Sequence, residues 1–207
     1  RHPRLAQNSK QRCFRKQRLL EKAGIVEKVG DNYLREIKCA LFCRIKNITG
    51  RKVSIVTDFY SLGIAPNILA ILDRLGFKIP TPIQEKSIQP AIEGKDMIGI
   101  AQTGTGKTLA FAVPMIQAAL RGRRGLVVLP TRELALQVNE VFHKVGFALG
   151  VRTAVLIGGE PIGRQTQALH RNPQILICTP GRIIDHLEQK TVSLKSIAVL
   201  VLDEADR

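Results

Sequence analysis

The stretch "AQTGTGKT", residues 101–108, decides which fold the surrounding sequence can adopt. Its two glycines let the backbone wrap closely, so that successive N–H groups can face one anion. Lys107 adds a point charge, the Thr108 hydroxyl suits Mg²⁺, and a helix that begins here directs its positive end to the same place. The stretch therefore predicts a phosphate-binding loop, although Ala101 stands where the usual pattern has Gly. A Gly-rich turn with a chance lysine is the weaker alternative.

Short apolar runs on both sides of this loop predict a parallel sheet. They occupy residues 97–101, 126–130, 153–157, 175–179 and 198–202, and each of the first four precedes a segment with helical character. Two further helices are expected at 65–77 and 81–94. Continuous apolar runs suit strands that are buried on both faces, and their alternation with helices predicts an α/β fold with helices on both sides of the sheet. Such sheets bind ligands at the carboxyl ends of their strands.

Two carboxylates follow the last apolar run. Asp203 comes directly after "AVLVL" and Glu204 follows it. An Asp at a strand end beside a phosphate loop binds Mg²⁺ directly or through water, and an adjacent Glu can orient and deprotonate an attacking water. Asp206 is expected to tie the site to other elements. An acidic loop after a buried strand is the alternative, and the phosphate loop upstream makes the active site the better interpretation.

Three other strand ends carry residues suited to a phosphodiester backbone. Thr131-Arg132, Gly158-Gly159 and the segment 179–182 each follow an apolar run. Capping threonines, helix dipoles, close-approach glycines and arginine forks are what such a backbone needs. Plain capping and loop formation would explain any one of these segments, whereas three at comparable positions favour binding. No aromatic residues are interleaved, so recognition by base stacking is not indicated.

Charge divides the chain near residue 57. Of the net charge of +15, most lies in residues 1–57, which hold 15 basic and 4 acidic residues. This segment is either a basic arm for a polyanion such as nucleic acid or a solvated tail, and its fold is not predicted. Its three cysteines, Cys13, Cys39 and Cys43, lack the spacing of a zinc site. No apolar run reaches the roughly 18 residues of a membrane span, and a reducing cytoplasm fits the cysteine content.

Taken together, residues 58–207 resemble the DEAD-box ATP-dependent RNA helicases. "AQTGTGKT" resembles motif I of that family, "PTREL" (130–134) motif Ia, "GG" (158–159) the GG motif, "TPGR" (179–182) motif Ib, and "DEAD" (203–206) motif II. "GFKIPTPIQ" (76–84) resembles the Q motif, with Phe59 as its isolated upstream aromatic residue.

The resemblance implies an incomplete first RecA-like domain at 58–207, with the Q motif at 59–84, the phosphate loop at 101–108 and the DEAD box at 203–206. ATP and Mg²⁺ are the implied cofactors, with Thr108 and Asp203 at the metal, partly through water, and Lys107, Asp203 and Glu204 in catalysis. The implied ATP-binding residues are Phe59, Gln84, Ala101, Gln102, Thr103, Gly104, Thr105, Gly106, Lys107 and Thr108. The implied contacts to the RNA backbone are Pro130, Thr131, Arg132, Gly158, Gly159, Thr179, Pro180, Gly181 and Arg182.

Gln84 has two interpretations. In the family it would read the adenine edge, with Phe59 packed near the base. The spacing Thr81-Pro82-Ile83-Gln84 also fits a capping box, in which Gln84 simply caps its own helix. The full set of motifs favours adenine.

The implied function is that of an RNA-dependent ATPase and helicase in the cytoplasm, with ribosome-assembly or RNA-decay proteins as partners. The second RecA-like domain and the Ser-Ala-Thr motif III are absent from the sequence, so we expect a piece that binds nucleotide weakly and unwinds nothing alone. One alternative is a non-catalytic RNA-binding module made of a truncated RecA-like domain and a basic arm. Another is a P-loop ATPase that acts on DNA or protein.

Overall fold

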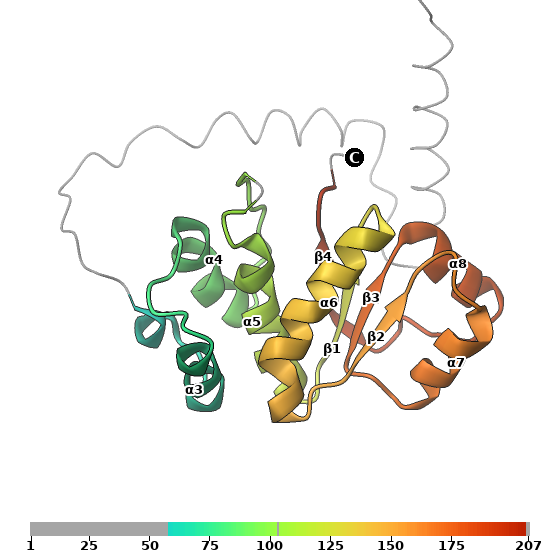
Figure 1. Cartoon of the computed structure of the whole chain (residues 1–207), viewed down its shortest axis with the longest axis horizontal. Coiled ribbons are helices and arrows are strands. Elements are labelled where there is room, and N and C mark those ends of the chain that lie inside the picture. The colour runs from blue at the N-terminus through green and yellow to red at the C-terminus, as the bar shows by residue number, and fades with distance from the viewer. Residues whose placement is uncertain (1–57, 103, 206–207) are drawn as a thin grey trace, which may run out of the picture. The chain divides into compact units, whose positions relative to one another are not determined.

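The computed structural model describes residues 58–102 and 104–205 (Figure 1). The predictions for residues 1–57, including the basic arm and the weak case for zinc, lie outside these residues and stay predictions. The same holds for Thr103 in the phosphate loop and for Asp206.

The described residues form a four-stranded sheet in which every neighbouring pair of strands is parallel. Its order is β2-β3-β1-β4, with β1 at Arg124–Val128, β2 at Thr153–Leu156, β3 at Ile175–Cys178 and β4 at Ile197–Leu202. All four residues of β3 are buried, as a strand with neighbours on both edges and helices on both faces requires. The parallel sheet predicted from the continuous apolar runs is confirmed.

Helices cover both faces of this sheet (Figure 1). On one face lie α5 (Lys107–Leu120) and α6 (Arg132–Gly146), the latter followed by the short η2 (Phe147–Leu149). On the other face lie α7 (Ile162–His170) and α8 (Pro180–Glu188). Each of α6, α7 and α8 connects one parallel strand to another, so all three begin at the carboxyl edge of the sheet.

The core has two parts, one on each face. The larger part includes Phe142 of α6 and Ile116 of α5, both fully buried against Ile175 and Ile177 of β3. The smaller part lies under α7 and α8 and includes Leu156, Leu176 and Ile183. Neighbouring residues of β3 contribute to opposite parts, because side chains alternate between the two faces of a strand.

Three short helices precede the phosphate loop: η1 (Phe59–Leu62), α3 (Pro66–Arg74) and α4 (Pro82–Ile92). Pro66 and Pro82 stand in the first turns of α3 and α4, where the missing N–H costs nothing. Both helices predicted in this region are confirmed. Gln117 of α5 joins this region to the core, because its Oε1 accepts from Ala65 N at 2.8 Å and its Nε2 donates to Gly63 O at 3.2 Å.

The strand predicted at 97–101 is wrong. Residues 97–100 are extended, but no strand of the described part pairs with them, and Ile98 and Ile100 are 74% and 72% exposed. An apolar run becomes a strand only where another strand offers backbone partners. The sheet edge on the side of β4 stays unpaired among the described residues, and Leu200 and Leu202 of β4 are exposed beside it.

The two hydrogen bonds of Gln117 lead to a prediction about stability. Gln117→Leu keeps the side chain nearly as large but leaves Ala65 N and Gly63 O without their partner. An unsatisfied polar group inside a protein costs about 1–3 kcal/mol, so we expect the free energy of unfolding to fall by about 2 kcal/mol or more. Urea denaturation would measure it. Gln89→Leu, the same change at an exposed position of α4, is the control, and equal losses in the two variants would contradict the prediction.

Candidate functional site

The phosphate loop leads directly into α5. Gly104 and Gly106 adopt φ of 81° and 84°, and Gly106 stands at the N-cap of the 14-residue helix. Thr105 closes the turn, since its Oγ1 donates to Gln102 O at 2.7 Å. Lys107 and Thr108 form the first turn of α5 and are half-buried. The loop thus brings a lysine, a hydroxyl and a positive helix end to one place, as the sequence predicted.

Gln84 connects α4 to this loop. Its Oε1 accepts from Thr81 N at 2.9 Å, which is the capping contact that the spacing predicted. Its Nε2 donates to Gly106 O at 3.0 Å. A Cβ at Gly106 would overlap Nε2 and lie 3.3 Å from Cδ of Gln84, so only glycine permits this approach. The cap is confirmed, and the role of Gln84 at adenine stays a prediction.

Phe59 lies in the larger core and is 2% exposed. Its ring therefore offers no solvent-exposed face on which a base could stack in this structure, and its predicted place near adenine stays a prediction.

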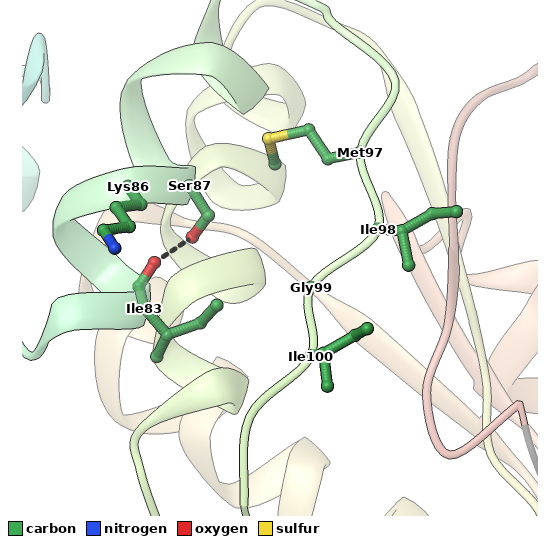
Figure 2. A pocket seen from close by; sticks show the side chains of 7 residues that line it. All are labelled: Ile83, Lys86, Ser87, Met97, Ile98, Gly99 and Ile100. Carbon is green, nitrogen blue, oxygen red and sulfur yellow. Dashed lines mark hydrogen bonds between the residues drawn. The ribbon is translucent and has the colours of Figure 1, made fainter. Parts of the chain in front are cut away.

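A hollow of about 450 Å³ lies between α4 and the extended segment 97–100 (Figure 2). Its lining is Ile83, Lys86, Ser87, Met97, Ile98, Gly99 and Ile100, and in the close-up Met97 points towards α4 whereas Ile98 points away from it. No residue of the phosphate loop lines this hollow, so it is separate from the predicted phosphate site.

The carboxylates come at the end of β4, on the same edge as the phosphate loop (Figure 1). Asp203 N donates to Val128 O at 3.1 Å, which continues the pairing of β4 with β1 and fixes where the Asp203 side chain starts. Asp203 Oδ1 accepts from Glu204 N at 3.0 Å, and Glu204 adopts a φ of 49°. The backbone therefore turns sharply at Glu204, the residue that the sequence predicted to orient and deprotonate the attacking water.

The residues predicted to hold Mg²⁺ supply hydroxyl and carboxylate oxygens, which are the ligands that this ion prefers. Within residues 58–102 and 104–205, no three His, Cys, Asp or Glu residues are placed to hold a metal ion as a group. Thr108 and Asp203 supply oxygen donors, and such donors suit Mg²⁺, which commonly takes its other ligands from phosphates and water.

Arg132 packs against the GG segment. It stands in the first turn of α6, after Thr131, whose Oγ1 accepts from Leu134 N at 3.3 Å as an N-cap. Gly159 has a φ of 81°, and a Cβ there would overlap the guanidinium and lie 2.7 Å from its Cζ. The close approach of backbone and arginine therefore requires glycine at 159, but not at 158, where a Cβ would meet nothing within 4 Å.

Arg182 reaches the same segment from the opposite side. Its Nη1 donates to Glu160 O at 2.8 Å, and its Nε lies 3.3 Å from Asp185 Oδ2. The α8 helix that carries it begins after Thr179 with Pro180 in its first turn, again without the loss of a needed N–H. The three segments predicted to meet a nucleic-acid backbone therefore meet each other at one edge, with the GG segment between two arginines. We call residues 130–132, 158–160 and 179–182 the rim.

Two parts of this arrangement had no signal in the sequence. The bond from Gln84 to Gly106 links residues 22 apart, and the contacts of the two arginines with residues 159 and 160 depend on the strand order. In the described part of the chain, no helix is long and apolar enough for a membrane crossing.

The parallel sheet, the helices on both faces and the glycine loop that opens α5 define a RecA-like P-loop domain. The model of the DEAD/DEAH box helicase family matches residues 81–207, and the chain belongs to this family. The resemblance given by the motifs is thereby confirmed.

Named relatives support the same assignment. The ATP-dependent rRNA helicase rrp3 of Emericella nidulans is 45% identical over 163 residues, which are 77% of this chain and 35% of that protein. The ATP-dependent RNA helicase CshA of Listeria monocytogenes is 47% identical over 154 residues, 73% of this chain and 30% of that protein. The chain thus spans about a third of the length of these relatives.

Solved structures agree with the fold. A DEAD box protein from Methanococcus jannaschii has a TM-score of 0.68 and 37% identity, over 72% of this chain and 42% of that one. A hypothetical ATP-dependent RNA helicase from Sulfolobus tokodaii has a TM-score of 0.64 and 36% identity, over 68% and 41% of the two chains.

The contact between Arg132 and Gly159 leads to a prediction. Gly159→Ala adds both a strained φ and a collision with the guanidinium, whereas Gly150→Ala adds the strain alone, because a Cβ at Gly150 meets nothing within 4 Å. Strain at a left-handed position costs roughly 1–2 kcal/mol. We expect Gly159→Ala to lower the free energy of unfolding, measured in urea, by only slightly more than Gly150→Ala does, because the guanidinium is the far end of a flexible, exposed side chain that can move aside.

The double variant with Arg132→Ala isolates the collision. Once the guanidinium is gone, the cost of Gly159→Ala should fall to that of Gly150→Ala. An unchanged cost in the Arg132→Ala background would show that the collision contributes nothing to the free energy of unfolding.

Proposed function

We propose that this chain is the part of an ATP-dependent RNA helicase that binds ATP and Mg²⁺ and grips the RNA backbone. The observation that carries the proposal is the meeting of the three rim segments at the sheet edge that also holds the phosphate loop and Asp203. The family assignment and the names of the relatives support RNA and ATP as its ligands.

Lys107 would contact the β- and γ-phosphates of ATP, and the N–H groups of the loop would bind the remaining phosphate oxygens. Thr108 and Asp203 would hold Mg²⁺, which when bound neutralises charge on the phosphates. Glu204 would orient the attacking water and accept its proton. Gln84 would add a contact to adenine, with Phe59 close by.

The rim would bind the sugar–phosphate backbone of RNA. Arg132 and Arg182 supply charge, the N-termini of α6 and α8 supply backbone donors, and Gly158 and Gly159 allow close approach. Such contacts do not read base sequence, so an RNA target would be chosen elsewhere. The names of the fungal relatives make ribosomal RNA the first substrate class to test.

Hydrolysis and unwinding are proposed for a two-domain protein rather than for these residues alone. The relatives, of whose length the matched residues cover about a third, support this. A non-catalytic RNA-binding module remains the second candidate, favoured by the charge excess in residues 1–57. ATPase activity of the 207-residue chain that RNA stimulates well above background would contradict both. The predicted cytoplasmic location and the partners in ribosome assembly or RNA decay stay predictions.

A lysine substitution tests the nucleotide site. Lys107→Ala removes a charge-assisted contact to phosphate, worth roughly 1.5–3 kcal/mol, so the affinity for Mg·ATP should fall about tenfold or more. Titration with a fluorescent ATP analogue measures this. Lys144→Ala, an exposed lysine near the far end of α6, is the control and should bind like the wild type. Equal affinities for the two variants would remove Lys107 from the site.

Salt dependence tests the RNA interface. Each phosphate contact to single-stranded RNA contributes about −0.7 to the slope of log K against log salt concentration. Arg132→Ala should weaken binding to a short labelled oligouridylate and make the slope less steep by about 0.7. Arg171→Ala, an exposed arginine just before β3 and so at the amino edge of the sheet, is the control. The same slope for Arg132→Ala and wild type would exclude the contact.

A further inference from the structure

His186 of α8 is fully buried, with 0% of its side chain exposed, and both of its ring nitrogens have partners. Nδ1 lies 2.7 Å from Thr191 Oγ1, and Nε2 lies 3.1 Å from Gln165 Oε1 of α7. Gln165 is itself buried and extends this series of hydrogen bonds, because its Nε2 donates to Ile157 O at 2.8 Å. A buried polar side chain is tolerated when its polar atoms are hydrogen-bonded, and this holds for both His186 and Gln165.

The directions of these bonds follow from the last one. Ile157 O can only accept, so Gln165 must turn its amide nitrogen to it and its amide oxygen to the imidazole. His186 Nε2 therefore carries the proton and donates, and Nδ1 accepts from the Thr191 hydroxyl. The same hydroxyl also lies within donating distance of His186 O, at 3.0 Å, but that carbonyl accepts from Thr191 N at 3.0 Å as well, so the hydroxyl proton can be shared with the closer Nδ1 at 2.7 Å.

The chain of bonds connects two segments of the rim. Ile157 directly precedes Gly158 and Gly159, and α8 begins with the segment 179–182. One helical turn before His186, Arg182 bonds to Glu160 O. The GG segment is thus tied to α8 on both sides of its two glycines, by Arg182 after them and by His186 through Gln165 before them.

We propose that His186 is a positioning residue for the rim, which holds the GG segment and the start of α8 at the separation that an RNA backbone requires. The inference rests on the proposed RNA contact of the rim. His186 touches no ligand in this role and acts through Gln165 and Ile157 O. A residue that only filled the core would need no directional bond to the GG segment.

Two substitutions separate positioning from packing. His186→Gln keeps an N–H donor for Gln165 Oε1, whereas His186→Met fills the volume without a donor. In the 207-residue chain, we expect His186→Met to weaken binding of the labelled oligouridylate roughly tenfold and His186→Gln to stay within about threefold of wild type. The affinity for Mg·ATP should be unchanged in both. Equal RNA affinity of His186→Met and wild type, or a parallel loss of ATP affinity, would overturn the proposal.

Hydrogen exchange decides the question without RNA. The amide of Thr179, which donates to Leu156 O at 3.0 Å between the two segments that His186 connects, should exchange faster in His186→Met than in wild type, and His186→Gln should restore the protection. If exchange changes in this way while Arg132→Ala leaves RNA affinity intact, positioning stands and the RNA contact fails. If exchange is the same in all three proteins, positioning fails whatever the RNA measurement shows.

The pH dependence of stability tests independently whether the His186 ring is buried and neutral. Burial lowers the pKa of His186 below its usual 6.5, the Arg182 charge lowers it further, and Asp185 opposes them. Gln165, Thr191 and Ile157 O, which face the ring from other elements, carry no charge. The neutral ring therefore contributes stability that is present above pH 6.5 and is lost as the pH falls from there through the lowered pKa. Urea denaturation of wild type should show this loss relative to His186→Gln, and identical pH profiles would contradict a buried neutral imidazole.

Discussion

The parallel pairing of the strands at a common height is the constraint on which the rest of the site depends. Val128 and Leu156 both pair with Cys178, and Val128 also pairs with Leu202, so all four strands end at one level. The pairing continues one residue further, where Leu129 N donates to Cys178 O at 2.9 Å and Thr179 N to Leu156 O at 3.0 Å. Every following segment therefore starts from a fixed point on one edge, although the first of these segments starts at Leu129 and the last at Asp203.

The two arginines of the rim show how structure and binding can share one side chain. Arg182 uses Nη1 for Glu160 O and Nε for the ion pair with Asp185, and a guanidinium has five N–H donors. These contacts within the protein fix the direction of the side chain, and the remaining donors would serve the proposed contact with phosphate. A side chain that is already held loses less conformational freedom when it binds, so the contacts that stiffen the rim would favour the proposed binding of RNA.

The sequence predicted those features that depend on residues close together in the chain, and it missed those that depend on distant residues. The continuous apolar runs were sufficient to predict β1 to β4, because a strand that is buried on both faces needs apolar residues at successive positions. The run at 97–101 has the same character and forms no strand, because pairing depends on a neighbour that the run does not encode. The two contacts of Gln84 differ in the same way. Its cap followed from a spacing of three residues, whereas its bond to Gly106 required the packing of α4 on α5.

His186 is the extreme case, since its position in α8 resembles that of any core residue. Its partners lie 5 and 21 residues away, and only the folded chain brings Gln165 and Thr191 to the two nitrogens. No motif in the sequence marked it for this reason.

The bonds of Gln84 within the protein would compete with the adenine contact proposed for it. Its oxygen is engaged by Thr81 N and one donor of its amide nitrogen by Gly106 O, and its side chain is 4% exposed. An adenine that needed both of these atoms would have to replace bonds that already hold the loop, or use the second amide hydrogen alone. Replacement would free Gly106 O at the N-cap of α5 and so alter the turn that carries Lys107 and Thr108. The proposed contact of Gln84 with adenine would therefore link recognition of the base to the shape of the phosphate loop, and a ligand that lacks the base would leave this side chain bonded to the loop.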